Sequence, residues 1–141
     1  SARGFKMREP EFPLVALVFS HEAAFIEYCL SEGVQPQPGL RGYYLPTSNR
    51  VALYDSAAEG HATAAGLDGT ILHEAVHQVA FNTGIHSRIG TNPKWVVEGL
   101  ATAFEVEAVR RNDRSRLPLA RVNRSRYGWF QQSRARRVKT S

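Results

Sequence analysis

The chain has 141 residues, 43% of them hydrophobic, which is enough for one domain with its own core and too little for two. Its single cysteine, Cys29, excludes an intrachain disulfide and a cysteine-rich zinc module, and we expect this residue to lie in the core. The net charge is +5, no run of 18 or more apolar residues predicts a membrane span, and the first residues lack the layout of a signal peptide.

The first third of the chain predicts a strand, a helix and a hairpin. Residues 12–19 form a short apolar, β-prone run, which predicts a buried strand. Ser20 stands where a helix cap is expected, and residues 22–30 have the apolar spacing of a helix. Two further strands are predicted at 42–45 and 50–54, and the turn residues between them indicate a hairpin.

The following residues predict a loop and two long helices. Small and polar residues dominate 55–68, which predicts a surface loop whose last aspartate caps a helix running to about Asn82. Asn92 followed by Pro93 predicts the start of a second helix, which we expect to end near Ala108. This order of elements predicts the α+β class, with a small mixed or antiparallel sheet packed on helices.

The charge of the chain is concentrated at its C-terminal end. We expect a domain over residues 1–110 and a basic, partly disordered segment over 111–141. After Glu107 there is one acidic residue against eleven arginines and lysines. Such a segment can contact nucleic acid, anionic lipid or an acidic protein, but it carries no nucleic-acid recognition motif, so no specific nucleic-acid partner is expected. We expect Trp129 and Phe130 to pack on the domain.

Three ionisable side chains interrupt the apolar run of residues 70–81, namely His73, Glu74 and His77. Residues four apart share one helix face, so both histidines can reach one ion at zinc–nitrogen distances of about 2.0–2.1 Å. Glu74 is rotated by about 100° from His73 and lies beside the ion, where it can take a proton from a bound water. The same pattern also fits two histidines without any chemical role. A second segment is needed to distinguish a metal site from this alternative.

A catalytic zinc site usually has a third protein ligand. The metzincin form requires histidine at position 83, where Thr83 stands, so that class is excluded. Glu98 is the candidate, because it lies 21 residues beyond His77 on a predicted helix that has room to fold back. An ordinary exposed glutamate is the alternative. Thr102 and Glu105 share the helix face of Glu98, and either is suited to orient a histidine through its second ring nitrogen.

The pattern H-E-x-x-H followed by W-x-x-E-G-x-A-x-x-F-E resembles the gluzincin branch of zinc metallopeptidases, in particular the bacterial peptidase-MA-like family DUF1570. The resemblance implies a zincin-like fold and one Zn²⁺ ion, with His73, His77 and Glu98 as ligands and Glu74 as the catalytic glutamate. It also favours a secreted or periplasmic bacterial protein. The chain departs from well-studied gluzincins in having little room after Glu107 for their large C-terminal helical subdomain.

These features predict a zinc-dependent metallopeptidase that acts on a peptide or protein substrate, with metal-activated water and Glu74 as general base. The reaction needs hydrogen-bond donors for the oxyanion, for which His86, Tyr127 and Tyr54 are the candidates. Two other functions stay open. One is a non-catalytic zinc domain that binds peptide or cell-wall material, and the other is a basic binding module that works through residues 110–139.

Overall fold

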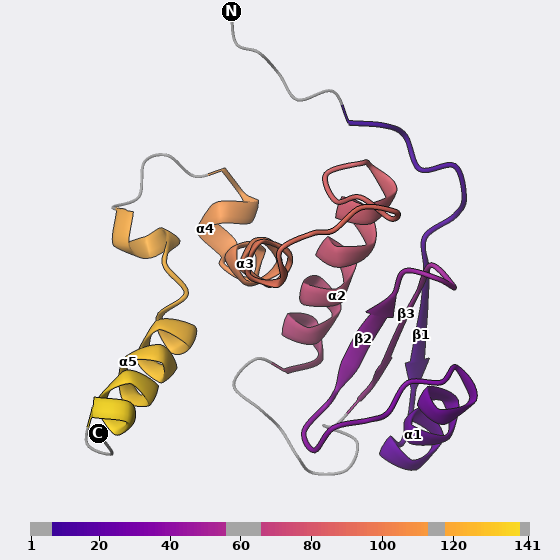
Figure 1. Ribbon diagram of the computed structural model, residues 1–141, viewed down its shortest axis with the longest axis horizontal. Helices are drawn as coiled ribbons and strands as arrows, with labels where there is room; N and C mark the ends of the chain where they lie inside the picture. Colours follow the sequence, from indigo (N-terminus) through magenta and orange to yellow (C-terminus); the bar gives the residue numbers. More distant parts are fainter. Residues whose placement is uncertain (1–6, 56–65, 113–117, 139–141) are drawn as a thin grey trace, which may run out of the picture.

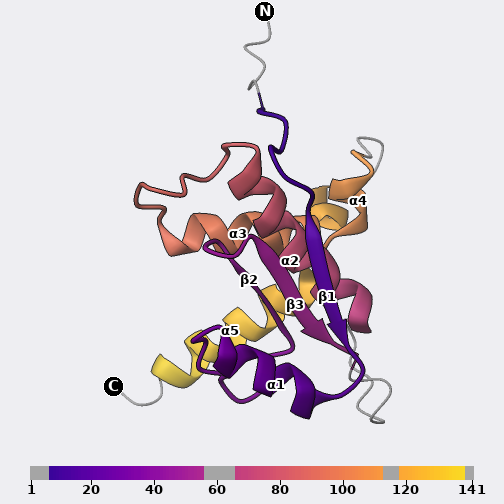
Figure 2. The same ribbon diagram turned by 90° about the vertical axis from the view of Figure 1, so that its right-hand side faces the viewer.

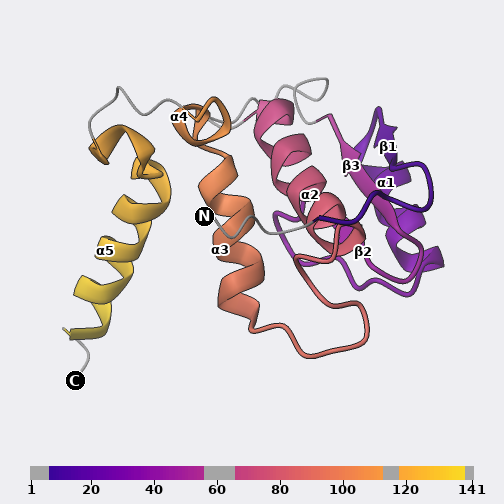
Figure 3. The same cartoon turned by 90° about the horizontal axis from the view of Figure 1, so that it is seen from above.

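The computed structural model describes residues 7–55, 66–112 and 118–138 and has the predicted α+β architecture with a small mixed sheet (Figure 1). In chain order the elements are β1 (Val15–Phe19), α1 (Glu22–Ser31), β2 (Gly42–Leu45), β3 (Arg50–Tyr54), α2 (Gly66–Asn82), α3 (Lys94–Phe104), α4 (Glu107–Arg110), the 3-10 helix η1 (Pro118–Arg121) and α5 (Arg124–Val138). The sheet lies between α1 on one face and α2 on the other (Figure 2). Helices α3 and α5 follow beyond α2, so α2 lies between the sheet and α3 (Figure 3).

The sheet has the strand order β1-β3-β2. β1 runs parallel to β3, with Leu17 opposite Ala52, and β2 runs antiparallel to β3, with Tyr44 opposite Val51. The predicted hairpin of β2 and β3 is therefore confirmed. Its turn contains Asn49 at φ 57°, in the left-handed region that asparagine tolerates better than most residues.

β1 lies at an edge of this sheet, and the prediction of a buried strand over residues 12–19 is wrong in two respects. The strand begins at Val15, and its side chains at Val15 and Val18 are 40% and 57% exposed. An apolar β-prone run indicates a strand, but it does not reveal whether other elements cover both faces and both edges. Among the described residues, only β3 pairs with β1.

The core on the α1 face of the sheet is formed by Phe25 and Cys29 of α1 together with Ala52 and Tyr54 of β3. Cys29 is completely buried, as predicted for a core residue, and burial raises the pKa of its thiol. The ring centroids of Phe25 and Tyr54 are 5.2 Å apart. The predicted cap of helix α1 is off by one residue. His21, and not Ser20, is at the N-cap position, and the helix begins at Glu22.

Helix α2 contacts β2 and β3 on one side and α3 on the other. It ends at Asn82 as predicted, but it begins at Gly66, so Asp68 lies in its first turn and not at its N-cap. Most of the predicted loop, residues 56–65, is outside the described residues. Gln78 joins α2 to the sheet, because its side-chain amide donates to the backbone oxygens of Val15 at 3.1 Å and Asn49 at 2.8 Å.

Helix α3 differs from its prediction at both ends. Pro93 is at the N-cap, while the Asn92 side chain instead donates to the Ser87 carbonyl at 2.7 Å and closes the preceding loop. The helix ends at Phe104 and not near Ala108. Val106 is extended, at φ −81° and ψ 120°, and α4 begins after it. The guanidinium of Arg110 donates to the carbonyls of residues 104 and 105, which satisfies acceptors that the end of a helix leaves unpaired.

The basic C-terminal segment contains η1 and α5. The expectation that Trp129 and Phe130 pack on the domain is wrong, since these side chains are 70% and 53% exposed. α5 lies beyond α3 and points away from the sheet (Figure 1). Over the described ranges, no helix has the length and apolar character needed to cross a membrane.

Candidate metal centre

Helices α2 and α3 bring the three predicted zinc ligands together. His73 Nε2 lies 3.3 Å from Glu98 Oε2, and His77 Nε2 lies 3.8 Å from the same oxygen. One ligand atom from each residue falls within a group whose members are all within 4.8 Å of one another. α3 therefore folds back against α2 in a way that places the three side chains close enough to share one metal ion.

The local structure explains this meeting. His73 and His77 are one turn apart on α2, and their rings are 4.8 Å apart in an edge-on arrangement. α3 packs along α2, and its residue Ala101 is completely buried, so a small side chain permits close packing of this helix. The Glu98 side chain is 48% exposed, which leaves the group of ligands open to solvent on the α3 side.

The donor set fits a zinc ion. Tetrahedral zinc with bonds of about 2.0–2.1 Å places its ligand atoms about 3.4 Å apart, close to the 3.3 Å and 3.8 Å found here. The widest separation, at most 4.8 Å, has to shorten by at most about 1.4 Å, which side-chain movement can supply. Two imidazoles and one carboxylate also suit zinc better than magnesium or calcium, which prefer oxygen ligands.

Electrostatics keep one of the two histidines in its ligating form. Burial lowers the pKa of His77, and the neighbouring charges of His73 and His86 lower it further, while Glu98 acts in the opposite direction. His77 is 7% exposed. A neutral imidazole has a free lone pair, which is the form that binds a metal.

Glu74 is buried beside the ligands, with 9% of its surface exposed. Burial raises its pKa from 4.5 to about 7, and the negative charge of Glu98 adds to the rise. The charge of His73 and a backbone hydrogen bond from Tyr44 in β2 partly offset it. A carboxyl group with a pKa near neutrality can both accept and release a proton at neutral pH.

Glu105 orients His73 from the side away from the ligand group. His73 Nδ1 donates to Glu105 Oε1 at 2.8 Å, and Nε2 on the opposite side of the ring faces Glu98 Oε2 at 3.3 Å. Burial alone would raise the pKa of Glu105, but hydrogen bonds from Arg126, His73 and Asn123 outweigh it and lower the pKa. Glu105 is therefore a carboxylate, and it has the contact predicted for it.

In the part of the chain that the structure describes, neither the side chain of Thr102 nor Nδ1 of His77 takes part in a hydrogen bond that would orient a histidine ring. The Thr102 side chain makes no hydrogen bond with the described residues, and only its backbone carbonyl accepts one, from Asn123 at 3.4 Å. His77 Nδ1 is buried and has no hydrogen-bond partner among the described residues. The orienting contact thus comes from Glu105 and acts on His73.

The three predicted oxyanion donors lie in different places. Tyr54 is on the α1 face of the sheet, where its hydroxyl donates to Glu22 at 3.3 Å, so it is not in the ligand group. His86 is 4% exposed and packs edge-on against Phe81, and its charge reaches His77. Tyr127 is 54% exposed on the first turn of α5.

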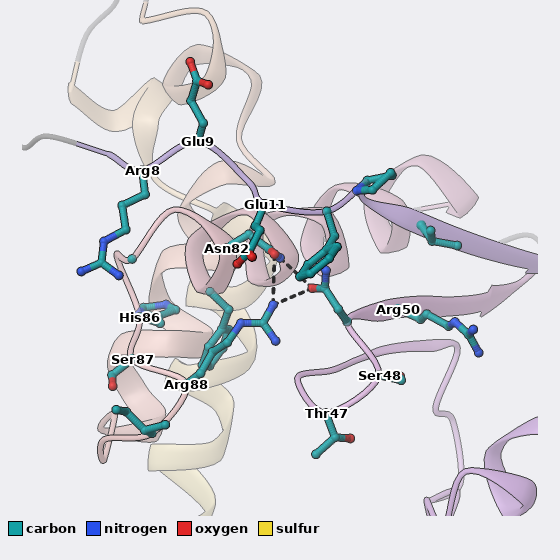
Figure 4. A pocket seen from close by; sticks show the side chains of 17 residues that line it. Arg8, Glu9, Glu11, Thr47, Ser48, Arg50, Asn82, His86, Ser87 and Arg88 are labelled. Carbon is teal, nitrogen blue, oxygen red and sulfur yellow. Dashed lines mark hydrogen bonds between the residues drawn. The ribbon is translucent and has the colours of Figure 1, made fainter.

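A cavity of about 980 Å³ lies at the other end of α2 (Figure 4). Its walls come from residues 8–15, the β2–β3 turn, the end of α2 and residues 84–89. Arg88 bridges these parts, donating to the Pro46 carbonyl at 2.6 Å, to Asn49 Oδ1 at 2.7 Å and to Asn82 Oδ1 at 3.1 Å. None of the three candidate ligands lines this cavity. We place the candidate site at the ligand group, because cavity size carries no chemistry by itself.

Sequence reasoning missed two residues of the site, Asn123 and Arg126, which donate to Glu105 at 2.7 Å and 3.1 Å. An asparagine before a helix is a recognised capping signal and predicts the start of α5. No local pattern, however, connects that helix to Glu105.

The chain matches the model of a known protein family. The family described as a protein of unknown function, DUF1570, matches residues 68–141, slightly more than half of the chain. No curated protein and no solved structure matches. The matched segment contains His73, Glu74, His77 and Glu98 together with Glu105 and α5. The chain belongs to the DUF1570 family.

Proposed function

We propose that the protein is a zinc-dependent metallopeptidase of the gluzincin type. One Zn²⁺ ion is held by His73, His77 and Glu98, and Glu74 is the general base. The observation that carries the proposal is the meeting of the three ligand atoms within 4.8 Å, next to a buried glutamate whose pKa is about 7.

Each residue has a defined task in this proposal. Zinc in such a site supplies an activated water and polarises the scissile carbonyl. The carboxylate of Glu74 accepts the proton released during attack on that carbonyl and later donates it to the leaving amine. A pKa near 7 serves both steps, because neither protonation state is then strongly disfavoured at neutral pH.

Strand β2 is suited to hold an extended peptide beside Glu74. It lies at one edge of the described sheet, and the backbone of Tyr44 in this strand reaches the Glu74 carboxyl group. A peptide that adds to a sheet edge pairs through its backbone, largely independently of its side chains. This arrangement supports a peptide substrate whose scissile bond lies next to α2.

Tyr127 is the oxyanion donor we favour. Its neighbour Arg126 contacts Glu105 at 3.1 Å, so the first turn of α5 begins beside the residue that contacts His73. Its side chain is exposed and accessible to a substrate, whereas His86 is buried and Tyr54 faces α1.

The proposal is tested with a fluorogenic peptide library, assayed with and without a metal chelator. We expect hydrolysis by the wild-type protein that chelation abolishes and zinc restores. Glu74→Gln should retain zinc and lose hydrolysis, while Glu27→Gln, an exposed glutamate on α1, should behave as wild type. Hydrolysis by Glu74→Gln at the wild-type rate would rule out the proposed general base.

A non-catalytic zinc domain that binds peptide is the second candidate. It is favoured by the position of the cavity of about 980 Å³, which is away from the ligands. In that case the wild-type protein and Glu74→Gln would bind peptides equally, and neither would cleave them.

A further inference from the structure

A series of hydrogen bonds connects the metal ligand His73 to the start of the basic helix α5. His73 Nδ1 donates to Glu105 Oε1 at 2.8 Å. Asn123 Nδ2 donates to Glu105 Oε2 at 2.7 Å, and Arg126 Nη2 donates to Oε1 at 3.1 Å. Both carboxylate oxygens are therefore held, and the Glu105 side chain is only 16% exposed.

Asn123 performs two tasks with opposite ends of one amide group. Its Oδ1 accepts from the backbone N–H of Arg126 at 3.2 Å, and its backbone oxygen accepts from Tyr127 N–H at 2.9 Å, so it caps α5. Its Nδ2 is then directed at Glu105. Aspartate would cap the helix equally well, but it would oppose the Glu105 carboxylate with a second negative charge.

We infer that Asn123 and Arg126 are positioning residues of the metal centre, and that α5 is a structural part of this centre. They fix the carboxylate of Glu105, which in turn fixes the ring of His73 with Nε2 directed at the ligand group. The inference rests on the proposed metal site. A partner that hydrogen-bonds a metal ligand directly, as Glu105 does, typically changes metal affinity about 10- to 100-fold when it is removed, and Asn123 and Arg126 act through this contact.

The contacts of Arg126 are better explained by positioning than by stability. Its side chain is 61% exposed, and ion pairs at this exposure contribute little to folding. Variants at this position are therefore expected to fold normally and to differ in metal affinity.

The direction in which the metal affinity changes distinguishes a positioning role from a simple effect of charge. Asn123→Asp and Arg126→Gln both make the surroundings of the ligands more negative, and by charge alone they would strengthen the binding of a cation. Loss of positioning weakens it. Arg124→Gln is the matched control, because it removes the same charge from the same turn, where Arg124 is exposed and has no hydrogen bond or ion pair with the described residues.

The experiment measures Zn²⁺ affinity of the full chain by competition with a chromophoric chelator, and records the visible spectrum of the Co²⁺-loaded proteins. We expect Kd for Zn²⁺ to rise at least tenfold in Asn123→Asp and severalfold in Arg126→Gln, with altered Co²⁺ spectra. Arg126→Lys should recover most of the affinity, and Arg124→Gln should bind as tightly as wild type or more tightly. Thermal unfolding of the metal-free Arg126 and Arg124 variants should be unchanged.

Two results would overturn the inference in distinguishable ways. If the wild type binds zinc and Asn123→Asp and Arg126→Gln bind it equally well or better, the positioning role is wrong and the metal site stands. If the wild type itself does not bind zinc, the proposed function fails and the inference fails with it.

Discussion

Replacement of Glu74 by glutamine should stabilise the metal-free protein at alkaline pH. Folding raises the pKa of Glu74 from 4.5 to about 7, chiefly by burial. Between these values the folded state binds more protons at this residue than the unfolded state, so the free energy of unfolding falls as pH rises through this window. At about 1.4 kcal/mol for each tenfold change in the ionisation constant, the loss is about 3 kcal/mol and is complete above pH 7.

Glutamine has nearly the shape of the protonated carboxyl group and no ionisation, so Glu74→Gln removes this loss. Urea unfolding of both metal-free proteins from pH 4 to pH 9 measures it. The variant should gain up to about 3 kcal/mol relative to wild type between the two ends of the range, since the groups that do not interact with Glu74 titrate alike in both proteins and cancel in the difference. Glu27→Gln is the control for an exposed site.

Zinc should reduce the pH dependence of the wild type, because a nearby cation favours the ionised carboxylate. Parallel stability curves for the two proteins over the whole pH range would refute the reasoning, since they would show that Glu74 ionises as easily in the folded protein as in the unfolded chain.

Three further predictions concern other parts of the molecule. Tyr127→Phe should lower kcat on peptides by about 10²-fold with little change in zinc content, and an unchanged kcat would exclude Tyr127 as oxyanion donor. Arg88→Ala should lower the free energy of unfolding by about 1–3 kcal/mol because it leaves several acceptors unpaired, whereas Arg111→Ala, which removes a surface ion pair, should change it by less than about 0.5 kcal/mol in urea unfolding. Gly42→Ala should be destabilising, because a Cβ there would lie 2.9 Å from Thr70 Cγ2 and 3.1 Å from the oxygen of residue 52. A Cβ at Gly99 meets nothing within 4 Å, so Gly99→Ala should stabilise α3. Equal unfolding midpoints for the two alanine variants would contradict these expectations.

The parts of the molecule that follow from local patterns were predictable. Strands 42–45 and 50–54 have the observed bounds, because β-prone residues flank a clear turn signal. His73 and His77 share a face because helix geometry alone places them there. The position of Glu98 beside the histidines could be predicted only after its helix was expected to fold back against the helix that contains His73 and His77.

Features that depend on neighbouring elements were not predictable. Residues 12–19 read as a buried strand, but β1 is an edge strand, and nothing in its own sequence reveals which neighbours cover it. Tyr54 follows Ala52 by two residues, so strand periodicity places both on one face, but only the fold shows that this is the α1 face. The contact between Asn123 and Glu105 joins residues 18 apart in sequence and depends on the break after α3.

The existence of the metal centre is tested by the zinc content of the purified full chain, together with its X-ray absorption spectrum at the zinc edge. We expect one zinc ion per chain with two imidazole ligands, and a changed coordination in Glu98→Ala. The metal centre would be contradicted if the chain did not take up one equivalent of zinc after incubation with the ion. It would also be contradicted if Glu98→Ala and His77→Ala left the spectrum unchanged.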